Sequence, residues 1–321
     1  MYNDDKINYF LVIVIGGLSV RTDALITIAP RDFDPTVELC GYSMIKRQIK
    51  SLIVAKPYRV IISGNRVEMR PVIKNCTRIG ADFLHPDMVA TSFREDIGSF
   101  IRGLTYLQGK CDRILVVPAN FPLINIDTYK LLLASDAELA VAQYKGKRGY
   151  PALLSSAYYD EALQLGNLGA LLDAHTDELT IIETDDEGVI TDVCAKKFSD
   201  KTAKRLSENH SLHRLRPNMS VEVAREESFF GIGIQQILRL IDETGSLVEV
   251  RRMMGMSSDQ AWKLTNRLRE VSGLALIESA EGNGTCLTQD GREFLEQYTK
   301  WRETCEENMV QAFYECFPQL K

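Results

Sequence analysis

Two contrasting patterns predict the fold class of this 321-residue chain. Through about residue 200, short β-rich runs alternate with helical stretches, which indicates an α/β domain with a Rossmann-like, mostly parallel sheet. The chain beyond residue 229 follows the order helix, helix, turn, helix, hairpin, which is typical of a winged helix-turn-helix domain. A chain of this length usually exceeds one hydrophobic core, so its length also predicts two domains.

The first domain should contain five strands with helices between them. The predicted strands are 9–15, 59–63, 113–117, 139–143 and 179–183, and the predicted helices include 44–54, 96–107 and 126–133. Because the carboxyl ends of parallel strands meet at one edge of a sheet, a ligand site is expected there. The turns after Ile15 and Val117 should therefore lie at the mouth of one site.

The sequence predicts domain boundaries at 1–200 for the α/β domain, 201–228 for a basic helical linker, and 229–321 for the winged helix with its long last helix. The basic residues in and just before the linker are Lys196, Lys197, Lys201, Lys204, Arg205, Arg214, Arg216 and Arg225. A partly exposed helix is one interpretation of this segment, and a contact with phosphate or a DNA backbone is the other.

Composition is that of an ordinary soluble protein. The formal net charge is −6, so the chain as a whole has no attraction for nucleic acid or an anionic membrane. None of the seven cysteines forms a C-x-x-C pair, which favours reduced thiols. The first residues lack the basic region of a signal peptide, and the apolar run at 9–15 is too short to span a bilayer. A cytoplasmic protein without a membrane partner is expected.

A glycine-rich turn follows the first predicted strand, with the sequence Gly16-Gly17-Leu18-Ser19-Val20-Arg21. Glycines in a βα turn let successive backbone N–H groups point into one concavity, which suits the phosphates of a nucleotide. Such a turn can equally serve only to pack a helix against a sheet. The nucleotide interpretation assigns Gly16, Gly17, Ser19 and Arg21 to binding.

This turn resembles the nucleotide loop of the molybdenum-cofactor guanylyl- and cytidylyltransferases, Gly-Gly-x-Ser-x-Arg-Met-Gly followed by a lysine. Three later segments resemble motifs of the same family in the same order, and they are 111–122, 146–151 and 186–192. The resemblance covers about the first 200 residues and implies a nucleotidyltransferase-like domain of the MobA/MocA type. It places Gly149 beside the nucleotide and Asp192 at the metal, with Mg²⁺ as the implied cofactor.

The chain departs from this family at charged positions. Asn120 stands where the family has its metal-binding aspartate, and Ile26 stands where the loop lysine is expected, after Thr22-Asp23 in place of Met-Gly. Within the transferred catalytic set Arg21, Asn120 and Asp192, only the arginine and the aspartate keep their charge. Losing one preorganised charge commonly costs about 10²–10³ in rate, so little transferase activity is expected. The alternative is that a neighbouring acid replaces the missing metal ligand.

The second domain resembles the N-terminal domain of ModE-type molybdate-responsive regulators. The matching segments are 228–233, 240–246, 254–257, 261–262 and 287–291. On its third helix, Ser258, Gln260, Lys263 and Arg267 are predicted to contact double-stranded DNA, and an ordinary solvated helix face is the alternative.

Two further observations bear on this domain. Residues 229–321 contain ten Lys and Arg against fourteen Asp and Glu, a net charge of −4 that opposes strong DNA binding. An apolar stripe on the last helix favours a homodimer or packing within the same domain. Its members are Leu295, Tyr298, Cys305, Met309, Ala312 and Cys316.

Three functions are compatible with these patterns. The first is a transcriptional regulator linked to the molybdenum cofactor, in which a degenerate transferase domain senses a nucleotide (CTP or GTP) or a pterin. The second is an active molybdopterin cytidylyl- or guanylyltransferase whose winged helix is autoregulatory. The third is a scaffold that uses both domains for protein contacts.

Overall fold

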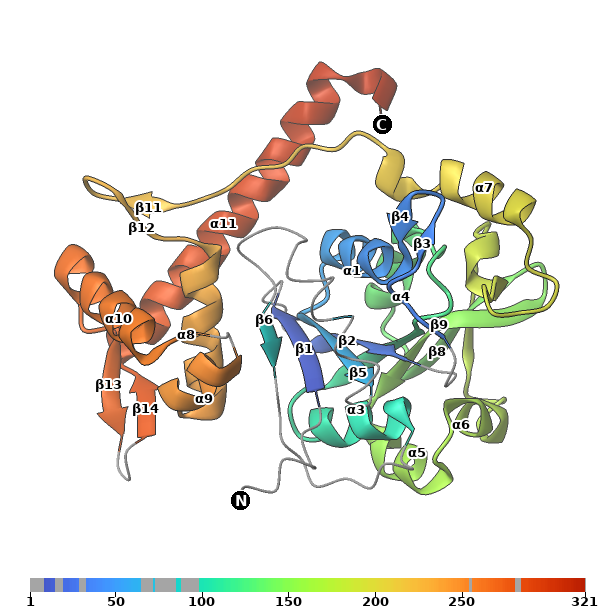
Figure 1. The fold of residues 1–321 in the computed structure, drawn as a ribbon, viewed down its shortest axis with the longest axis horizontal. Coiled ribbons are helices and arrows are strands. Elements are labelled where there is room, and N and C mark those ends of the chain that lie inside the picture. The colour runs from blue at the N-terminus through green and yellow to red at the C-terminus, as the bar shows by residue number, and fades with distance from the viewer. Residues whose placement is uncertain are drawn as a thin grey trace. The chain divides into compact units, whose positions relative to one another are not determined.

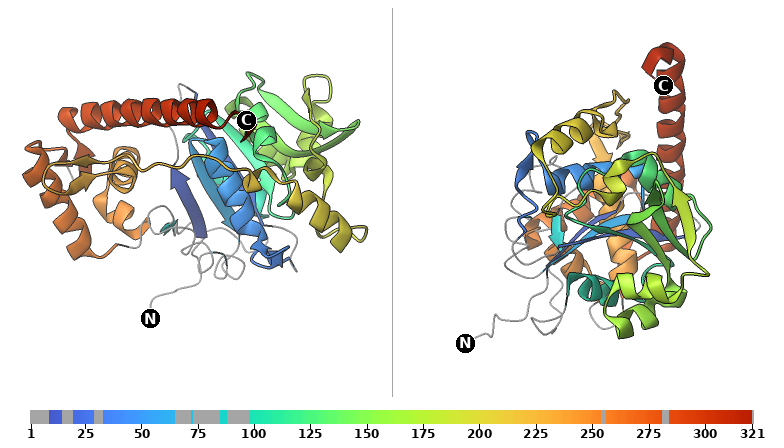
Figure 2. Two further views of the ribbon diagram at one scale, coloured as in Figure 1. Left: turned by 90° about the horizontal axis from the view of Figure 1, so that it is seen from above. Right: turned by 90° about the vertical axis from the view of Figure 1, so that its right-hand side faces the viewer.

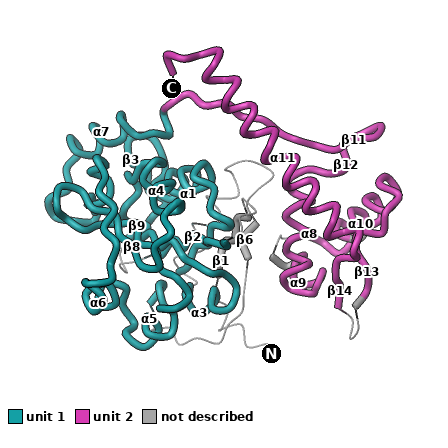
Figure 3. Tube along the Cα trace, turned by 180° about the vertical axis from the view of Figure 1, so that it is seen from behind, with its two compact units in different colours: residues 1–79, 88–213 teal, residues 80–87, 214–321 magenta. Residues whose placement is uncertain are grey.

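The computed structural model describes residues 9–14, 20–28, 33–64, 72, 85–87, 98–253, 256–280 and 284–320. The chain divides into two compact units (Figure 3). The first comprises residues 1–79 and 88–213, and the second comprises residues 80–87 and 214–321. Among the helices within these described ranges, none combines the length and the apolar character needed to cross a bilayer.

The first unit is an α/β fold built around a mostly parallel sheet, as predicted. Its strands lie in the order β10-β8-β9-β7-β2-β5-β1 (Figure 1). β2 is parallel to both β5 and β7, and β10 is parallel to β8, whereas β9 and β1 are antiparallel to their neighbours. The bounds are β1 (Tyr9–Val14), β2 (Thr22–Thr27), β5 (Arg59–Gly64), β7 (Arg113–Pro118), β8 (Leu139–Tyr144), β9 (Lys147–Ser155) and β10 (Thr180–Glu183).

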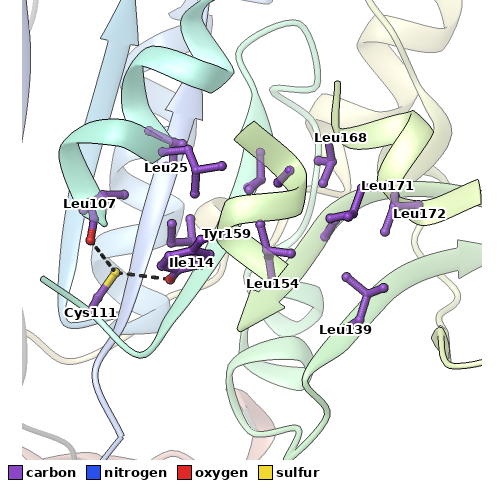
Figure 4. Close-up of a cluster of buried hydrophobic side chains, with 14 of the residues drawn as sticks. Leu25, Leu107, Cys111, Ile114, Leu139, Leu154, Tyr159, Leu168, Leu171 and Leu172 are labelled. Atoms are coloured by element: carbon purple, nitrogen blue, oxygen red, sulfur yellow. Dashed lines mark hydrogen bonds between the residues drawn. The ribbon is translucent and has the colours of Figure 1, made fainter. Parts of the chain in front are cut away.

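Helices cover both faces of this sheet (Figure 1, Figure 2). One face carries α1 (Met44–Ala55) and α4 (Ile126–Leu133), and the other carries α3 (Ser99–Leu107), α5 (Tyr159–Leu165) and α6 (Leu168–Ala174). The main core lies under α3, α5 and α6, where Leu25, Ile114 and Leu154 pack together (Figure 4). Cys111 is buried in this core against the Tyr159 hydroxyl, and burial raises the pKa of its thiol to about 12, so it packs as an apolar residue.

The centre of the sheet differs from the prediction. The run at 9–15 was expected to lead through a βα turn into a helix. The next described element is instead the strand Thr22–Thr27, directly after Arg21, so the prediction of a βα turn was wrong. All six residues of β2 are buried, while β1 pairs antiparallel with β5. Asp23 is tolerated inside this buried strand because the guanidinium of Arg59 binds its carboxylate, with Nε at 3.1 and 3.2 Å from the two oxygens.

The segment after β10 folds back onto the first unit. It contains the 3₁₀ turn η2 (Glu187–Ile190), α7 (Asp200–Glu208) and the 3₁₀ turn η3 (Ser211–His213). Ser211 Oγ accepts a hydrogen bond from the Ile126 N–H at 2.8 Å, and His210 Nε2 lies 3.0 Å from the Ile124 carbonyl. Residues 201–213, the first half of the predicted linker, are therefore hydrogen bonded to the first unit. Residues 214–222 form no helix or strand.

The second unit contains three helices, a hairpin and a long helix, in that order. After the short pair β11 (Val223–Ala224) and β12 (Ser228–Phe230) come α8 (Ile232–Thr244), α9 (Leu247–Met253), α10 (Ser258–Ser272), β13 (Ile277–Ala280), β14 (Gly284–Leu287) and α11 (Gln289–Cys316). β6 (His85–Asp87) is grouped with this unit. The core contains Phe230, Ile241, Leu268 and Tyr298, so the N-terminal part of the α11 stripe packs within its own unit.

Candidate functional site

The sheet of the first unit has a topological switch point between β2 and β7. The chain leaves β2 and reaches β5 on one side, then passes through α3 to β7 on the other side. Open α/β sheets bind ligands at the carboxyl ends of the strands beside such a point. Here the Ala119 N–H donates to the Thr27 carbonyl at 2.9 Å, which joins the ends of β7 and β2. The next described elements after β2 are the hairpin β3 (Glu38–Leu39) and β4 (Tyr42–Ser43), which precede α1.

Asn120 lies in the turn directly after β7. The residue is 8% exposed, and its carbonyl accepts a hydrogen bond from the Val193 N–H at 3.0 Å. Its carboxamide makes no hydrogen bond to any residue that the structure describes. A nearly buried amide at the switch point therefore has both its donor and its acceptor available to a ligand.

Asp192 lies next to this turn, because its neighbour Val193 is hydrogen bonded to Asn120. The carboxylate of Asp192 is half-buried, and its Oδ1 accepts from the Cys194 N–H at 2.8 Å. Burial raises the pKa of Tyr150, and the charge of Asp192 raises it further. The Tyr150 ring packs edge-on against Phe121 with 4.8 Å between centroids. Two aromatic rings, a carboxylate and a carboxamide are thus gathered at one edge of the sheet.

Two glycines allow this close packing of loops. A Cβ on Gly149 would lie 2.0 Å from the Val189 carbonyl oxygen, and one on Gly188 would lie 2.1 Å from the Leu123 carbonyl oxygen. Real Cβ atoms do not approach that closely, so both positions require glycine. Backbone packing is therefore a sufficient reason for Gly149, whose contact with a nucleotide remains a prediction.

Asp186 anchors the loop that carries Asp192, and sequence reasoning did not single it out. Its carboxylate accepts four hydrogen bonds, two from Asn125, one from the Thr128 hydroxyl and one from the Gly188 N–H, at 2.7–3.1 Å. Burial raises the pKa of this carboxyl, although the donated hydrogen bonds oppose the shift. The available signal was an acid immediately before a Glu-Gly turn, which is a common feature of surface loops.

Arg21 lies at the opposite edge of the sheet. Its N–H donates to Asp112 Oδ2 at 2.8 Å, and its guanidinium carbon lies 4.2 Å from the centroid of the Tyr58 ring. Because Arg21 precedes β2 and Asn120 follows β7, the two are separated by a six-residue strand, about 20 Å at about 3.3 Å per residue. The structure therefore brings together Asn120 and Asp192 but not Arg21.

The remaining predicted residues of the first unit are placed as follows. Gly16, Gly17 and Ser19 lie outside the described residues. Ile26 is fully buried within β2, so its comparison with a loop lysine was wrong. The carboxyl end of β2, beside the switch point, is where a ligand-binding loop is expected instead.

On α10 of the second unit the predicted DNA contacts are exposed, but each has a partner within the unit. Lys263 pairs with Asp259 at 2.9 Å, and Arg267 pairs with Glu227 at 2.9 Å. Ser258 accepts a hydrogen bond from Arg251. The Gln260 carboxamide is part of a capping box, because its Oε1 accepts from the Ser257 N–H at 2.8 Å. Any DNA phosphate must therefore compete with these acids for the two cations.

No protein of curated function matches this chain. A nucleotidyl transferase of Methanothermobacter is 14% identical and covers 59% of this chain and 99% of its own, with a TM-score of 0.47. Rv0371c of Mycobacterium tuberculosis H37Rv, solved with manganese, is 12% identical over 59% of this chain and 98% of its own, with a TM-score of 0.44.

A 4-diphosphocytidyl-2C-methyl-D-erythritol synthase of Anaerococcus prevotii is 11% identical over 58% of this chain and 98% of its own, with a TM-score of 0.43. The sequence matches the MobA-like NTP transferase domain over residues 11–179, which is just over half of the chain. This match includes the switch point and the Asn120 turn. The chain therefore belongs to the family of MobA-like NTP transferase domains.

Proposed function

We propose that the first unit binds a nucleoside triphosphate, CTP or GTP, or a pterin at the carboxyl ends of β2 and β7, with little transfer activity. The observation that carries this proposal is the unpartnered, nearly buried carboxamide of Asn120 beside Asp192. An amide can hydrogen bond to a base, a sugar or a phosphate, but it cannot neutralise a metal ion. Within this proposal the protein senses its ligand in regulation linked to the molybdenum cofactor, and it does not catalyse synthesis of that cofactor.

The described residues fit a metal site only if the phosphates of the nucleotide supply part of the coordination. Among them, no group of three His, Cys, Asp or Glu side chains could hold an ion. Mg²⁺ in phosphoryl-transfer sites is often held by one or two carboxylates together with phosphate oxygens. Asp192 and the side-chain oxygen of Asn120 fit that smaller contribution, so the phosphates would hold most of the Mg²⁺ coordination and nucleotide affinity would depend little on the ion. The ion would then neutralise phosphate charge.

The alternative is an active molybdopterin cytidylyl- or guanylyltransferase whose second unit is autoregulatory. One observation favours it. Ile26 lies inside β2, so the absence of lysine at that position does not count against catalysis. The only remaining departure at a described position of the proposed metal site is Asn120.

Calorimetric titration of the full-length chain with CTP and GTP, with and without Mg²⁺, together with a turnover assay with molybdopterin, tests the proposed function and the enzyme alternative. In the proposed function, wild type binds a nucleotide with little dependence on Mg²⁺, and Asn120→Asp makes binding depend on Mg²⁺ and raises turnover with molybdopterin by about 10²-fold. The matched control is Asn167→Asp, because Asn167 caps α6 and aspartate caps equally well. Turnover by wild type at the rate of Asn120→Asp would establish the enzyme alternative. If wild type binds neither a nucleotide nor a pterin, both the proposed function and the enzyme alternative are excluded.

For the second unit we propose a winged helix-turn-helix domain that binds double-stranded DNA as a homodimer and makes the protein a transcriptional regulator. The order α8, α9, α10, β13, β14 supports this, with Ser258, Gln260, Lys263 and Arg267 on the exposed side of α10. A salt-dependent gel shift tests it. Lys263→Ala should reduce both affinity and the salt slope, whereas Lys300→Ala on α11, which removes the same charge, should not. Equal behaviour of the two variants would remove the assignment of α10.

A further inference from the structure

A buried glutamine on α1 holds both sides of the Asn120 turn. Gln48 is 1% exposed, and its Nε2 donates to the Pro118 carbonyl at 2.8 Å and to the Phe121 carbonyl at 3.1 Å. These two carbonyls bracket Ala119 and Asn120 in the sequence. One side chain from a distant helix therefore fixes the start and the end of the turn.

The oxygen of the same Gln48 amide indicates that this side chain serves as a hydrogen-bond donor. Gln48 Oε1 is buried, and it has no hydrogen-bond partner among the described residues. Leaving a buried acceptor without a donor is unfavourable, and an apolar side chain of similar length would avoid that cost. The two hydrogen bonds donated by Nε2 are what a glutamine adds at this position.

Within the described part of the chain, two backbone hydrogen bonds also join this turn to other segments. Ala119 N–H donates to Thr27 at the end of β2, and Val193 N–H donates to the Asn120 carbonyl. Among the hydrogen bonds that the described residues make to this turn from other segments, those from Gln48 use a side chain, so they can be removed by substitution.

We propose that Gln48 is a positioning residue that sets the direction of the Asn120 carboxamide toward the ligand. This inference rests on the proposed nucleotide site of the first unit. Gln48 itself does not touch the ligand. It acts by fixing the Pro118 and Phe121 carbonyls on either side of Asn120.

The test compares Gln48→Met with Gln108→Met in the full-length chain. Gln108 makes a hydrogen bond to Asp160 on the surface, so its replacement is the same chemical change away from the turn. Calorimetry with CTP and Mn²⁺ should show about tenfold weaker binding for Gln48→Met, the equivalent of one or two lost hydrogen bonds, and no change for Gln108→Met. Wild-type affinity in Gln48→Met would overturn the proposal.

A second readout separates this proposal from the proposed function. The side-chain NH₂ resonances of Asn120, identified by their loss in Asn120→Asp, should shift in Gln48→Met and stay fixed in Gln108→Met. If wild type binds neither CTP nor GTP, the proposed nucleotide site is refuted. The Asn120 resonances still show whether Gln48 positions the Asn120 carboxamide. Unmoved resonances would overturn it.

Gln48→Glu provides a folded variant should the methionine disrupt packing. A carboxylate at this buried position cannot donate, whereas the protonated acid can donate one hydrogen bond, and burial favours the protonated form. Binding of CTP with Mn²⁺ should therefore be weak at pH 8 and partly restored at pH 6 in this variant alone. Affinity that does not change with pH relative to wild type would contradict the positioning role.

Discussion

His210 offers a direct test of how the segment after β10 is held on the first unit. The imidazole is 1% exposed, and its Nε2 donates to the Ile124 carbonyl at 3.0 Å. Its Nδ1 accepts from the Leu212 N–H at 3.2 Å, so the ring must be neutral to make both bonds. Protonation would turn the acceptor into a donor that faces another donor.

The pKa of His210 is lowered to about 4, chiefly by burial and then by the positive charge of Arg47. The folded pKa is below the unfolded value, so the folded state binds fewer protons than the unfolded state. The stability that neutral His210 supports is therefore present above about pH 6.5 and is lost as the pH falls toward 4. Between pH 7 and pH 5 the free energy of unfolding of the first unit should fall by about 2 kcal/mol on this account.

The perturbation is His210→Gln, which keeps one donor and one acceptor but does not titrate in this range. Urea unfolding at pH 7 and pH 5 should show the loss of about 2 kcal/mol in wild type but not in the variant. Both tryptophans, Trp262 and Trp301, belong to the second unit, so circular dichroism with tryptophan fluorescence separates the two transitions. His175→Gln is the control, because contacts with Glu161 raise the pKa of His175 and its stabilising contribution is lost as the pH rises. Parallel stability profiles for wild type and His210→Gln would refute the reasoning.

Three further predictions concern the stability of each unit. Arg59→Met leaves the Asp23 carboxylate buried without its guanidinium, so urea unfolding should show a loss of about 3–5 kcal/mol, and a loss below about 1 kcal/mol would contradict the buried pair. Gly149→Ala places a Cβ 2.0 Å from the Val189 oxygen, and calorimetry should show a loss of about 1–3 kcal/mol. An unchanged melting temperature would exclude that clash. Ser257→Ala removes the cap of α10, and tryptophan fluorescence should report about 1 kcal/mol less stability in the second unit only.

Local patterns predicted much of the first unit. The run at 126–133 was expected to be a helix and forms α4 with the same bounds, because its apolar spacing is that of one helix face. The family resemblance implied that Asn120 and Asp192 belong to one site, and in the structure Val193, the neighbour of Asp192, is hydrogen bonded to the Asn120 carbonyl. Strand β9 was missed because it begins with Lys147 and Arg148 and contains Pro151, which disguise a strand.

The sequence by itself determined the alternation of strands and helices, the membership of the chain in a nucleotidyltransferase-like fold, and the neutral residue at the Asn120 turn. These depend on local periodicity and on short motifs. Only the tertiary structure decided which strand occupies the centre of the sheet, which edge Arg21 lies on, and that Gln48 and Asp186 hold the site. Those features depend on partners far away in the sequence, as when Arg59 makes it possible to bury Asp23 in β2. A charged residue that looks like part of a loop can therefore lie in a central strand, and no local pattern reveals the partner that allows it.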